Sequence, residues 1–176
     1  MRCIGLQNKC IVITGGGNGL GRALARKFAS SNHSVVLLGR TLDSLQQVAK
    51  DIGGAASVLQ CDVSDPESVR SAFQVIADRF HTVDVLVNNA GVYQPFFITD
   101  STDEQIASAT GTNLNGPIYC SRSAIPLMKK VPTSSISAVK LSGKTMPCFH
   151  FIRAAKLDSN DLPRQCTTNS NRWESG

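Results

Sequence analysis

Short runs of aliphatic and β-branched residues recur between positions 9 and 130, separated by stretches in which apolar residues return at helical spacing. The runs with strand length and content are 9–14, 34–39, 56–61 and 83–88. The stretches with helical spacing between them are 20–31, 42–52 and 66–80. This alternation of strand and helix is typical of a parallel sheet covered on both faces, so we expect an α/β, doubly wound domain.

The pattern continues less regularly beyond residue 100. A capping box at 101–104 predicts a helical region that runs to Lys130, with a break near Gly111. After this point 133–139 is compatible with one more strand and 149–157 with a short amphipathic piece. Polar residues dominate 158–176, which we expect to be a disordered tail. The sequence therefore divides into an ordered domain at 1–130, a divergent segment at 131–157 and the tail.

Charge, cysteine spacing and the length of the apolar stretches bear on whether the protein binds nucleic acid, binds a metal or spans a membrane. The net charge of +5 permits contact with nucleic acid, but no run of Lys and Arg exceeds two residues, so we expect no nucleic-acid partner. The six cysteines show neither a C-x-x-C pair nor the His/Cys spacing of a zinc site, which indicates free thiols and no metal site. No apolar stretch reaches the roughly 20 residues of a membrane helix. We expect an intracellular, cytoplasmic protein with no membrane span.

The segment 14–21, Thr-Gly-Gly-Gly-Asn-Gly-Leu-Gly, joins the first predicted strand to the first predicted helix. Gly15, Gly19 and Gly21 lack a Cβ that would hinder a positive φ, a nearby pyrophosphate or close helix packing. The N-terminus of the helix offers unpaired N–H groups to a diphosphate. A strand before and a helix after favour a dinucleotide-binding loop over a simple glycine turn.

Arg40 follows the second strand, where a dinucleotide fold presents a side chain to the adenosine ribose. An acidic residue there would accept a hydrogen bond from the 2′-hydroxyl of NAD, whereas a guanidinium suits a 2′-phosphate. The sequence therefore predicts NADP(H) in preference to NAD(H). A solvated loop arginine is the alternative interpretation.

Three further motifs follow the glycine loop: Cys61-Asp62-Val63, Asn88-Asn89-Ala90-Gly91 and Asn113-x-x-Gly116. In this order and spacing the four motifs resemble the N-terminal half of a short-chain dehydrogenase/reductase. The resemblance implies a Rossmann-like fold, incomplete on its C-terminal side, in an NAD(P)(H)-dependent oxidoreductase. Such an enzyme reduces a carbonyl or oxidises a secondary alcohol, and its substrate is a small molecule.

The resemblance also implies roles for single residues. Asp62 would bind the adenine amino group beside Val63, Asn113 would anchor a catalytic water, and the segment 88–91 would form the cofactor floor. From the residues alone, 62–66 is equally an ordinary helix-capping turn and 88–91 an Asn-rich turn. The residues expected to bind cofactor are Gly15, Asn18, Gly19, Leu20, Gly21, Arg40, Asp62, Val63, Asn89, Ala90 and Gly91.

The family's catalytic Tyr-x-x-x-Lys pair is absent from the sequence. The two tyrosines, Tyr93 and Tyr119, are followed four positions later by Phe97 and Ser123. Because loss of a positioned acid typically lowers the rate by roughly 10² to 10⁴, we expect weak or no turnover. The alternative function is a truncated, non-catalytic isoform that binds nucleotide or forms homo- or hetero-oligomers with family members. We also expect the fourth strand to lack a partner on its outer edge.

Overall fold

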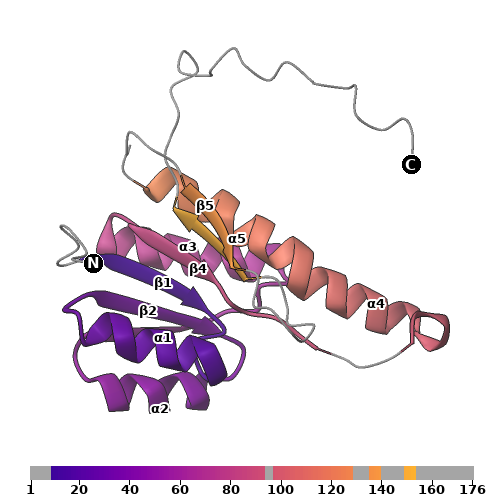
Figure 1. The fold of residues 1–176 in the computed structure, drawn as a ribbon. Helices are drawn as coiled ribbons and strands as arrows, with labels where there is room; N and C mark the ends of the chain where they lie inside the picture. The colour runs from indigo at the N-terminus through magenta and orange to yellow at the C-terminus, as the bar shows by residue number, and fades with distance from the viewer. Residues whose placement is uncertain (1–8, 94–96, 129–134, 140–148, 154–176) are drawn as a thin grey trace, which may run out of the picture.

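The computed structural model describes residues 9–93, 97–128, 135–139 and 149–153. Four parallel strands form the sheet that the sequence predicts, in the order β3-β2-β1-β4. The strands β2, β1 and β4 can be followed side by side in Figure 1. The four parallel strands are β1 (Cys10–Thr14), β2 (Ser34–Gly39), β3 (Ala56–Gln60) and β4 (Val85–Asn88). Each lies within its predicted range, and the crossover from β3 to β4 brings β1 and β4 side by side.

The three crossover helices are α1 (Gly19–Ala29), α2 (Leu42–Ile52) and α3 (Pro66–Phe80). The bounds of α2 and α3 match the prediction. The carboxylate of Asp65 accepts a hydrogen bond from the N–H of Glu67, and Pro66 occupies the first turn, where its missing N–H costs nothing. The end of α3 is His81, in the left-handed region at φ 61°.

The helical region after residue 97 departs from the prediction in two ways. Its elements are η1 (Ile98–Asp100), α4 (Asp103–Thr110), a π-helical turn η2 (Gly111–Asn115), α5 (Gly116–Ala124) and η3 (Ile125–Leu127). The capping box is formed by Thr102 and Gln105, not by the residues at 101 and 104, because Ser101 donates to the carbonyl of Phe97 instead. The predicted break at Gly111 is confirmed as the π-helical turn.

The second departure is the early end of this region. The helix was expected to reach Lys130, but α5 ends at Ala124 and a 3₁₀ turn follows. Pro126 has no N–H to donate to the carbonyl four residues earlier, which ends the α-helical bonding. Lys129, Lys130 and the predicted tail at 158–176 lie outside the described residues.

The outer edge of β4 is paired, so the expectation of an unpartnered edge is wrong. The strand β6 (Phe149–Arg153) runs antiparallel to β4, with Leu86 opposite Ile152, and β5 (Ser135–Val139) pairs with β6. Antiparallel pairing needs no helical crossover, so β6 covers this edge without the connection that a further parallel strand requires. The strand that 133–139 is compatible with is confirmed over residues 135–139, and residues 149–153 of the expected amphipathic piece form a strand.

Apolar side chains fill both faces of the parallel sheet. On one face, Val12 and Leu38 pack with Phe73 of α3 and Cys120 of α5. On the other, the alternate strand residues pack with α1 and α2, in the cluster Ile11, Ile13, Leu37, Ala25, Leu45 and Val48. The buried strands hold their carboxyl ends in fixed positions, and loops that follow these ends form the site described below. No helix in the described part of the chain is long and apolar enough to cross a membrane.

Candidate functional site

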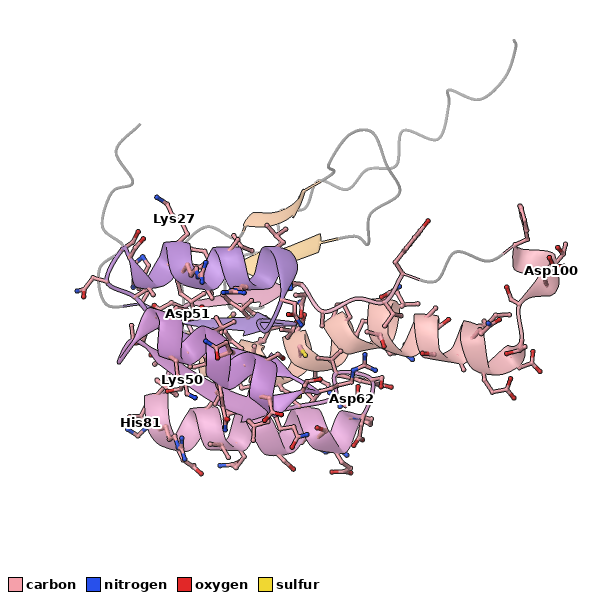
Figure 2. All side chains as sticks on the ribbon, turned by 90° about the horizontal axis from the view of Figure 1, so that it is seen from below. Lys27, Lys50, Asp51, Asp62, His81 and Asp100 are labelled. Carbon is pink, nitrogen blue, oxygen red and sulfur yellow. The ribbon has the colours of Figure 1, made fainter. Side chains whose placement is uncertain are left out.

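A cleft of about 710 Å³ lies at the carboxyl ends of the four parallel strands. Asp62 marks this end of the domain in Figure 2, and Lys27 and His81 lie toward the opposite end. Ten of the eleven predicted cofactor-binding residues line the cleft: Gly15, Asn18, Gly19, Leu20, Arg40, Asp62, Val63, Asn89, Ala90 and Gly91. Four loops that are distant in sequence therefore converge on one hollow, where ligands bind in doubly wound sheets.

The glycine loop lies directly against the end of β4. Gly15 has φ +65°, and a Cβ on this residue would lie 2.9 Å from the Cα of Ala90. Both the backbone conformation and the close approach exclude larger residues at this position. The loop therefore packs on the end of β4 with no space for a side chain at position 15, and the loop and this strand end together form a narrow cradle.

Gly21 is the predicted cofactor-binding residue that does not line the cleft. A Cβ on it would overlap the carbonyl oxygen of Gly15 and lie 2.6 Å from the side-chain amide of Asn89. Its lack of a side chain lets the first turn of α1 pack behind the loop. Gly21 thus supports the cradle from the side away from the cleft.

The loop after β2 brings Arg40 and Thr41 to the cleft, and the first turn of α2 brings Ser44. The side chain of Gln60 donates a hydrogen bond of 2.8 Å to the carbonyl of Arg40, which ties this loop to the end of β3. Arg40 is exposed, so its guanidinium is accessible to an anionic group in the cleft.

Asp62 and Val63 follow β3. One oxygen of Asp62 accepts hydrogen bonds from the N–H and the hydroxyl of Ser64, at 3.0 and 2.7 Å. Burial raises the pKa of Asp62, but these hydrogen bonds and the charge of Arg40 outweigh it and hold the pKa below its usual value. Asp62 therefore presents a carboxylate to the cleft. Gly116 leaves room for Val63, because a Cβ there would lie 2.8 Å from its Cγ2.

A hydrogen-bonded cluster joins the ends of β1 and β4, and sequence reasoning missed its centre, Thr14. The hydroxyl of Thr14 accepts from the N–H groups of Asn89 and Ala90, at 3.0 and 2.9 Å, and donates to the carbonyl of Val87 at 3.4 Å. The side-chain amide of Asn89 donates to the carbonyls of Thr14 and Gly15, each at 3.0 Å. The position of Thr14 at the start of the glycine motif was the only signal in the sequence.

Asn113 lies in the π-helical turn η2 and contacts the loop after β4. Its Nδ2 donates to the carbonyl of Val92, and its Oδ1 accepts from the N–H of Val92. The side chain itself is not part of the cleft lining, whereas Val92 is. Asn113 therefore contacts the cleft only through Val92, a residue of its wall.

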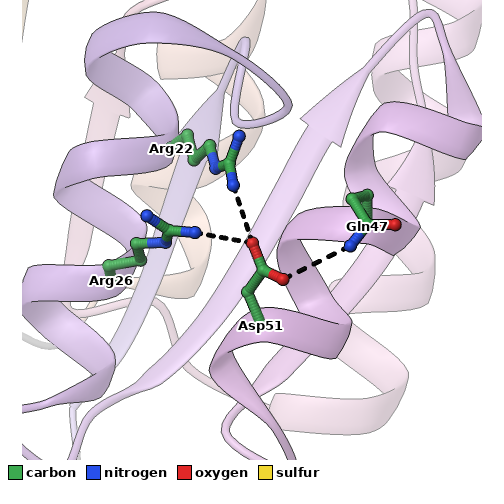
Figure 3. A network of polar contacts seen from close by, with 4 residues as sticks. All are labelled: Arg22, Arg26, Gln47 and Asp51. Carbon is green, nitrogen blue, oxygen red and sulfur yellow. Dashed lines mark hydrogen bonds and ion pairs between the residues drawn. The ribbon is translucent and has the colours of Figure 1, made fainter.

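A polar clamp links the two helices that carry the glycine loop and the Arg40 loop (Figure 3). The carboxylate of Asp51 on α2 accepts from Arg22 at 2.8 Å and from Arg26 at 2.6 Å, both on α1. Gln47 donates to its other oxygen at 3.3 Å. The guanidinium of Arg26, with further hydrogen bonds from Arg22 and Gln47, holds the pKa of Asp51 below its usual value although burial opposes it.

The thiols of Cys10, Cys61 and Cys120 are free and buried. Burial raises the pKa of Cys10 to about 11, that of Cys120 to about 12, and that of Cys61 above its usual value. These thiols are therefore protonated at neutral pH, which disfavours a nucleophilic role. In the described part of the chain no three His, Cys, Asp or Glu side chains are grouped to hold a metal ion.

Comparison with known proteins agrees with this geometry. A family model described as short chain dehydrogenase matches residues 9–153. The chain is 32% identical over 138 residues to meso-2,3-butanediol dehydrogenase of Serratia marcescens, covering 78% of this chain and 55% of that protein. It is 38% identical over 174 residues to the short chain dehydrogenase pigC of Monascus ruber, covering 89% of this chain and 57% of that protein.

Solved structures show the same similarity. A 3-ketoacyl-(acyl-carrier-protein) reductase from Brucella melitensis, complexed with NADH, has 33% sequence identity and a TM-score of 0.67, over 70% of this chain and 51% of that one. A glucose/ribitol dehydrogenase of the same organism has 28% identity and a TM-score of 0.68, over 71% and 54%. The chain spans little more than half the length of these relatives. From the family match and the shared fold, the chain belongs to the short-chain dehydrogenase family.

Proposed function

We propose that the cleft binds NADP(H) and that the chain acts in the carbonyl and secondary-alcohol chemistry of its family, with weak or no turnover of its own. One observation carries the binding proposal: ten residues selected by motif meet in one cleft, where the glycine loop packs so closely on the end of β4 that no side chain fits at Gly15. The NADH in the Brucella reductase supports a nicotinamide dinucleotide as the ligand class.

The residues of the cleft suit the parts of such a cofactor. The glycine loop and the start of α1 would receive the diphosphate, since unpaired N–H groups at a helix N-terminus attract anions. Asp62 would accept from the adenine amino group, and Asn89, Ala90 and Gly91 would form the floor beneath the ribose and nicotinamide. When bound, the cofactor supplies or accepts a hydride.

Preference for NADP(H) rests on Arg40. Arg40 lines the cleft and is exposed, and it occupies the position after β2 where an acidic residue would favour NAD(H), so a 2′-phosphate at this position would meet a cation. A charge-assisted hydrogen bond contributes roughly 1.5 to 3 kcal/mol, which corresponds to one to two decades in affinity.

Weak turnover follows from the missing acid. Reduction of a carbonyl requires a proton at the developing alkoxide, and no Tyr-x-x-x-Lys is present in the sequence to supply it. Asn113 hydrogen-bonds Val92 through both ends of its amide, and the role that the family resemblance implies for it, anchoring a catalytic water, stays part of this proposal.

A second candidate function is association with another subunit, of this chain or of a family member. Three large apolar side chains on the η2–α5–η3 segment are exposed: Leu114 at 58%, Ile118 at 54% and Ile125 at 40%. Exposed apolar surface of this kind marks interaction sites. Light scattering after gel filtration measures the mass of the particle in solution. A strictly monomeric chain would rule out association as its function.

The test of the main proposal combines binding with turnover. Titration of the chain into NADPH, followed by nucleotide fluorescence, is expected to show saturable binding that is tighter than for NADH. Mixing the complex with ketones and aldehydes is expected to give NADPH oxidation slower than typical enzymes by roughly 10² to 10⁴. Absence of binding would reject the cofactor proposal, and turnover at ordinary enzyme rates would reject the claim of weak activity.

A further inference from the structure

Thr112 is a buried polar residue in the wall of the cleft. It lies in the π-helical turn η2, is 8% exposed and lines the cleft together with Asp62 and Val63. A hydroxyl can donate one hydrogen bond and accept two, and burying it without a partner costs free energy. A hydroxyl at this depth is therefore expected to have a hydrogen-bond partner.

The hydroxyl of Thr112 has no such partner in the described part of the chain. Two neighbours on the same helical segment bond back to the carbonyl four residues earlier: Thr110 donates to Ile106 at 2.7 Å, and Ser121 donates to Pro117. No hydrogen bond of this kind, or of any other, joins the Oγ1 of Thr112 to a described residue. This oxygen is not sealed inside the protein either, so it is open to the cleft that Thr112 lines.

Two glycines bring the turn that carries Thr112 against the loop after β3. A Cβ on Gly111 would lie 3.3 Å from the Cβ of Ser64, and a Cβ on Gly116 would lie 2.8 Å from Cγ2 of Val63. Thr112 lies between these two glycines in the sequence. The turn η2 therefore packs on the segment 63–64, and Thr112 belongs to the same wall of the cleft as this loop.

The polar groups of this wall complement each other. The carboxylate of Asp62 can only accept hydrogen bonds, and one of its oxygens already accepts from Ser64. Under the proposed function its free acceptor receives the adenine amino group. The ring nitrogen next to an amino group of adenine also only accepts, so it needs a donor that a carboxylate cannot supply. The hydroxyl of Thr112 has its hydrogen available for this purpose.

We propose that Thr112 is a binding residue for the adenine base, and that its hydroxyl donates to a ring nitrogen of the base. This inference rests on the proposed binding of NADP(H) and deepens it by assigning a donor to the adenine subsite. Because the hydroxyl has no partner among the described residues of the free chain, its removal should weaken binding without weakening the fold. A hydroxyl that only supported the structure would have the opposite effect.

The experiment is calorimetric titration of the whole chain with two probes, NADPH and adenosine 2′,5′-bisphosphate, which carries the adenine base but no nicotinamide. Thr112→Val keeps the shape of the side chain and removes the hydroxyl, and Thr112→Ser restores a hydroxyl as the rescue. Thr110→Val is the matched control, because it makes the same change two residues earlier, where the hydroxyl bonds to Ile106. Thermal melts of the free variants report on the fold.

Thr112→Val is expected to weaken the binding of both probes by the same factor, about threefold to tenfold, and to melt no lower than the unmodified chain without nucleotide. Thr112→Ser and Thr110→Val should bind both probes as the unmodified chain does. Unchanged affinities in Thr112→Val, a loss confined to NADPH, or a lowered Tm of the free variant would overturn the proposal. If the unmodified chain bound neither probe, the proposed function itself would fail.

Discussion

Asn113 and Val92 form a pair of hydrogen bonds across 21 positions of sequence. Nδ2 of Asn113 donates to the carbonyl of Val92, and the N–H of Val92 donates to Oδ1, both at 2.9 Å. The side chain thereby satisfies the backbone of a loop residue that pairs with no strand in the described part of the chain. This contact joins the π-helical turn η2 to the wall of the cleft.

Replacement of Asn113 by alanine should remove both hydrogen bonds and lower the free energy of unfolding by about 1 to 3 kcal/mol. Urea unfolding followed by circular dichroism measures the change. Asn115→Ala, two residues along the same turn, is the matched control and should change stability by less than about 0.5 kcal/mol. Equal stability of Asn113→Ala and Asn115→Ala would mean that the pair on Val92 contributes nothing.

Gly21→Ala should be far more damaging than its small volume suggests. The new Cβ would overlap the carbonyl of Gly15 and press on the amide of Asn89, so the backbone must move. We expect a loss of about 1 to 3 kcal/mol in stability together with weaker NADPH binding. Thermal melts and titrations with NADPH measure both effects.

Gly54→Ala provides the contrast, because a Cβ at this glycine would meet no atom within 4 Å. This variant should unfold at the same temperature as the unmodified chain or slightly above it, since alanine restricts the unfolded state. A Gly54→Ala variant as impaired as Gly21→Ala would show that the close contact behind the loop is not the cause.

The clamp at Asp51 should make stability depend on pH. Its pKa is lowered in the folded chain, so the stabilisation is fully present above the ordinary value of about 4 and is lost as the pH falls through the folded pKa. Asp51→Asn should therefore be less stable than the unmodified chain at pH 7, and the difference should vanish at low pH. Denaturant melts of both chains between pH 2 and 7 provide the measurement. A difference in stability that does not change with pH would mean that the charge of Asp51 does not cause it.

Arg40→Asp should reverse the cofactor preference. A carboxylate would repel the 2′-phosphate of NADPH and accept from the 2′-hydroxyl of NADH. The ratio of the two dissociation constants is expected to shift by one to two decades or more in favour of NADH. Equal affinities for the two cofactors in the unmodified chain would already exclude a role for Arg40.

The parallel sheet was open to prediction from the sequence because its strands are buried on both faces and read as continuous apolar runs. The glycine loop and the motifs after β3 and β4 also identified most of the cleft lining, because they follow strands that end at the same edge. The capping box was misplaced by one residue because two overlapping S/T-x-x-E/Q patterns begin at Ser101 and Thr102. Only the course of the backbone in three dimensions decides whether the hydroxyl of Ser101 or that of Thr102 accepts a hydrogen bond from the N–H three residues later.

Two other features depend on tertiary contacts that no local pattern reports. The hydrogen bonds of Thr14 join residues about 75 positions apart, and a threonine at a strand end carries no distinguishing signal. The pairing of β6 with β4 was missed because a short apolar run fits a helix segment as well as a strand.

A thermal melt of the purified chain with NADPH, with NADH and without nucleotide tests the central claim most directly. A ligand that binds only the folded chain adds about 2.7 kcal/mol of stability at a hundredfold excess over its dissociation constant. We predict a clear upward shift of Tm with NADPH and a smaller one with NADH. A Tm that neither nucleotide changes would contradict the assignment of the cleft as a dinucleotide site.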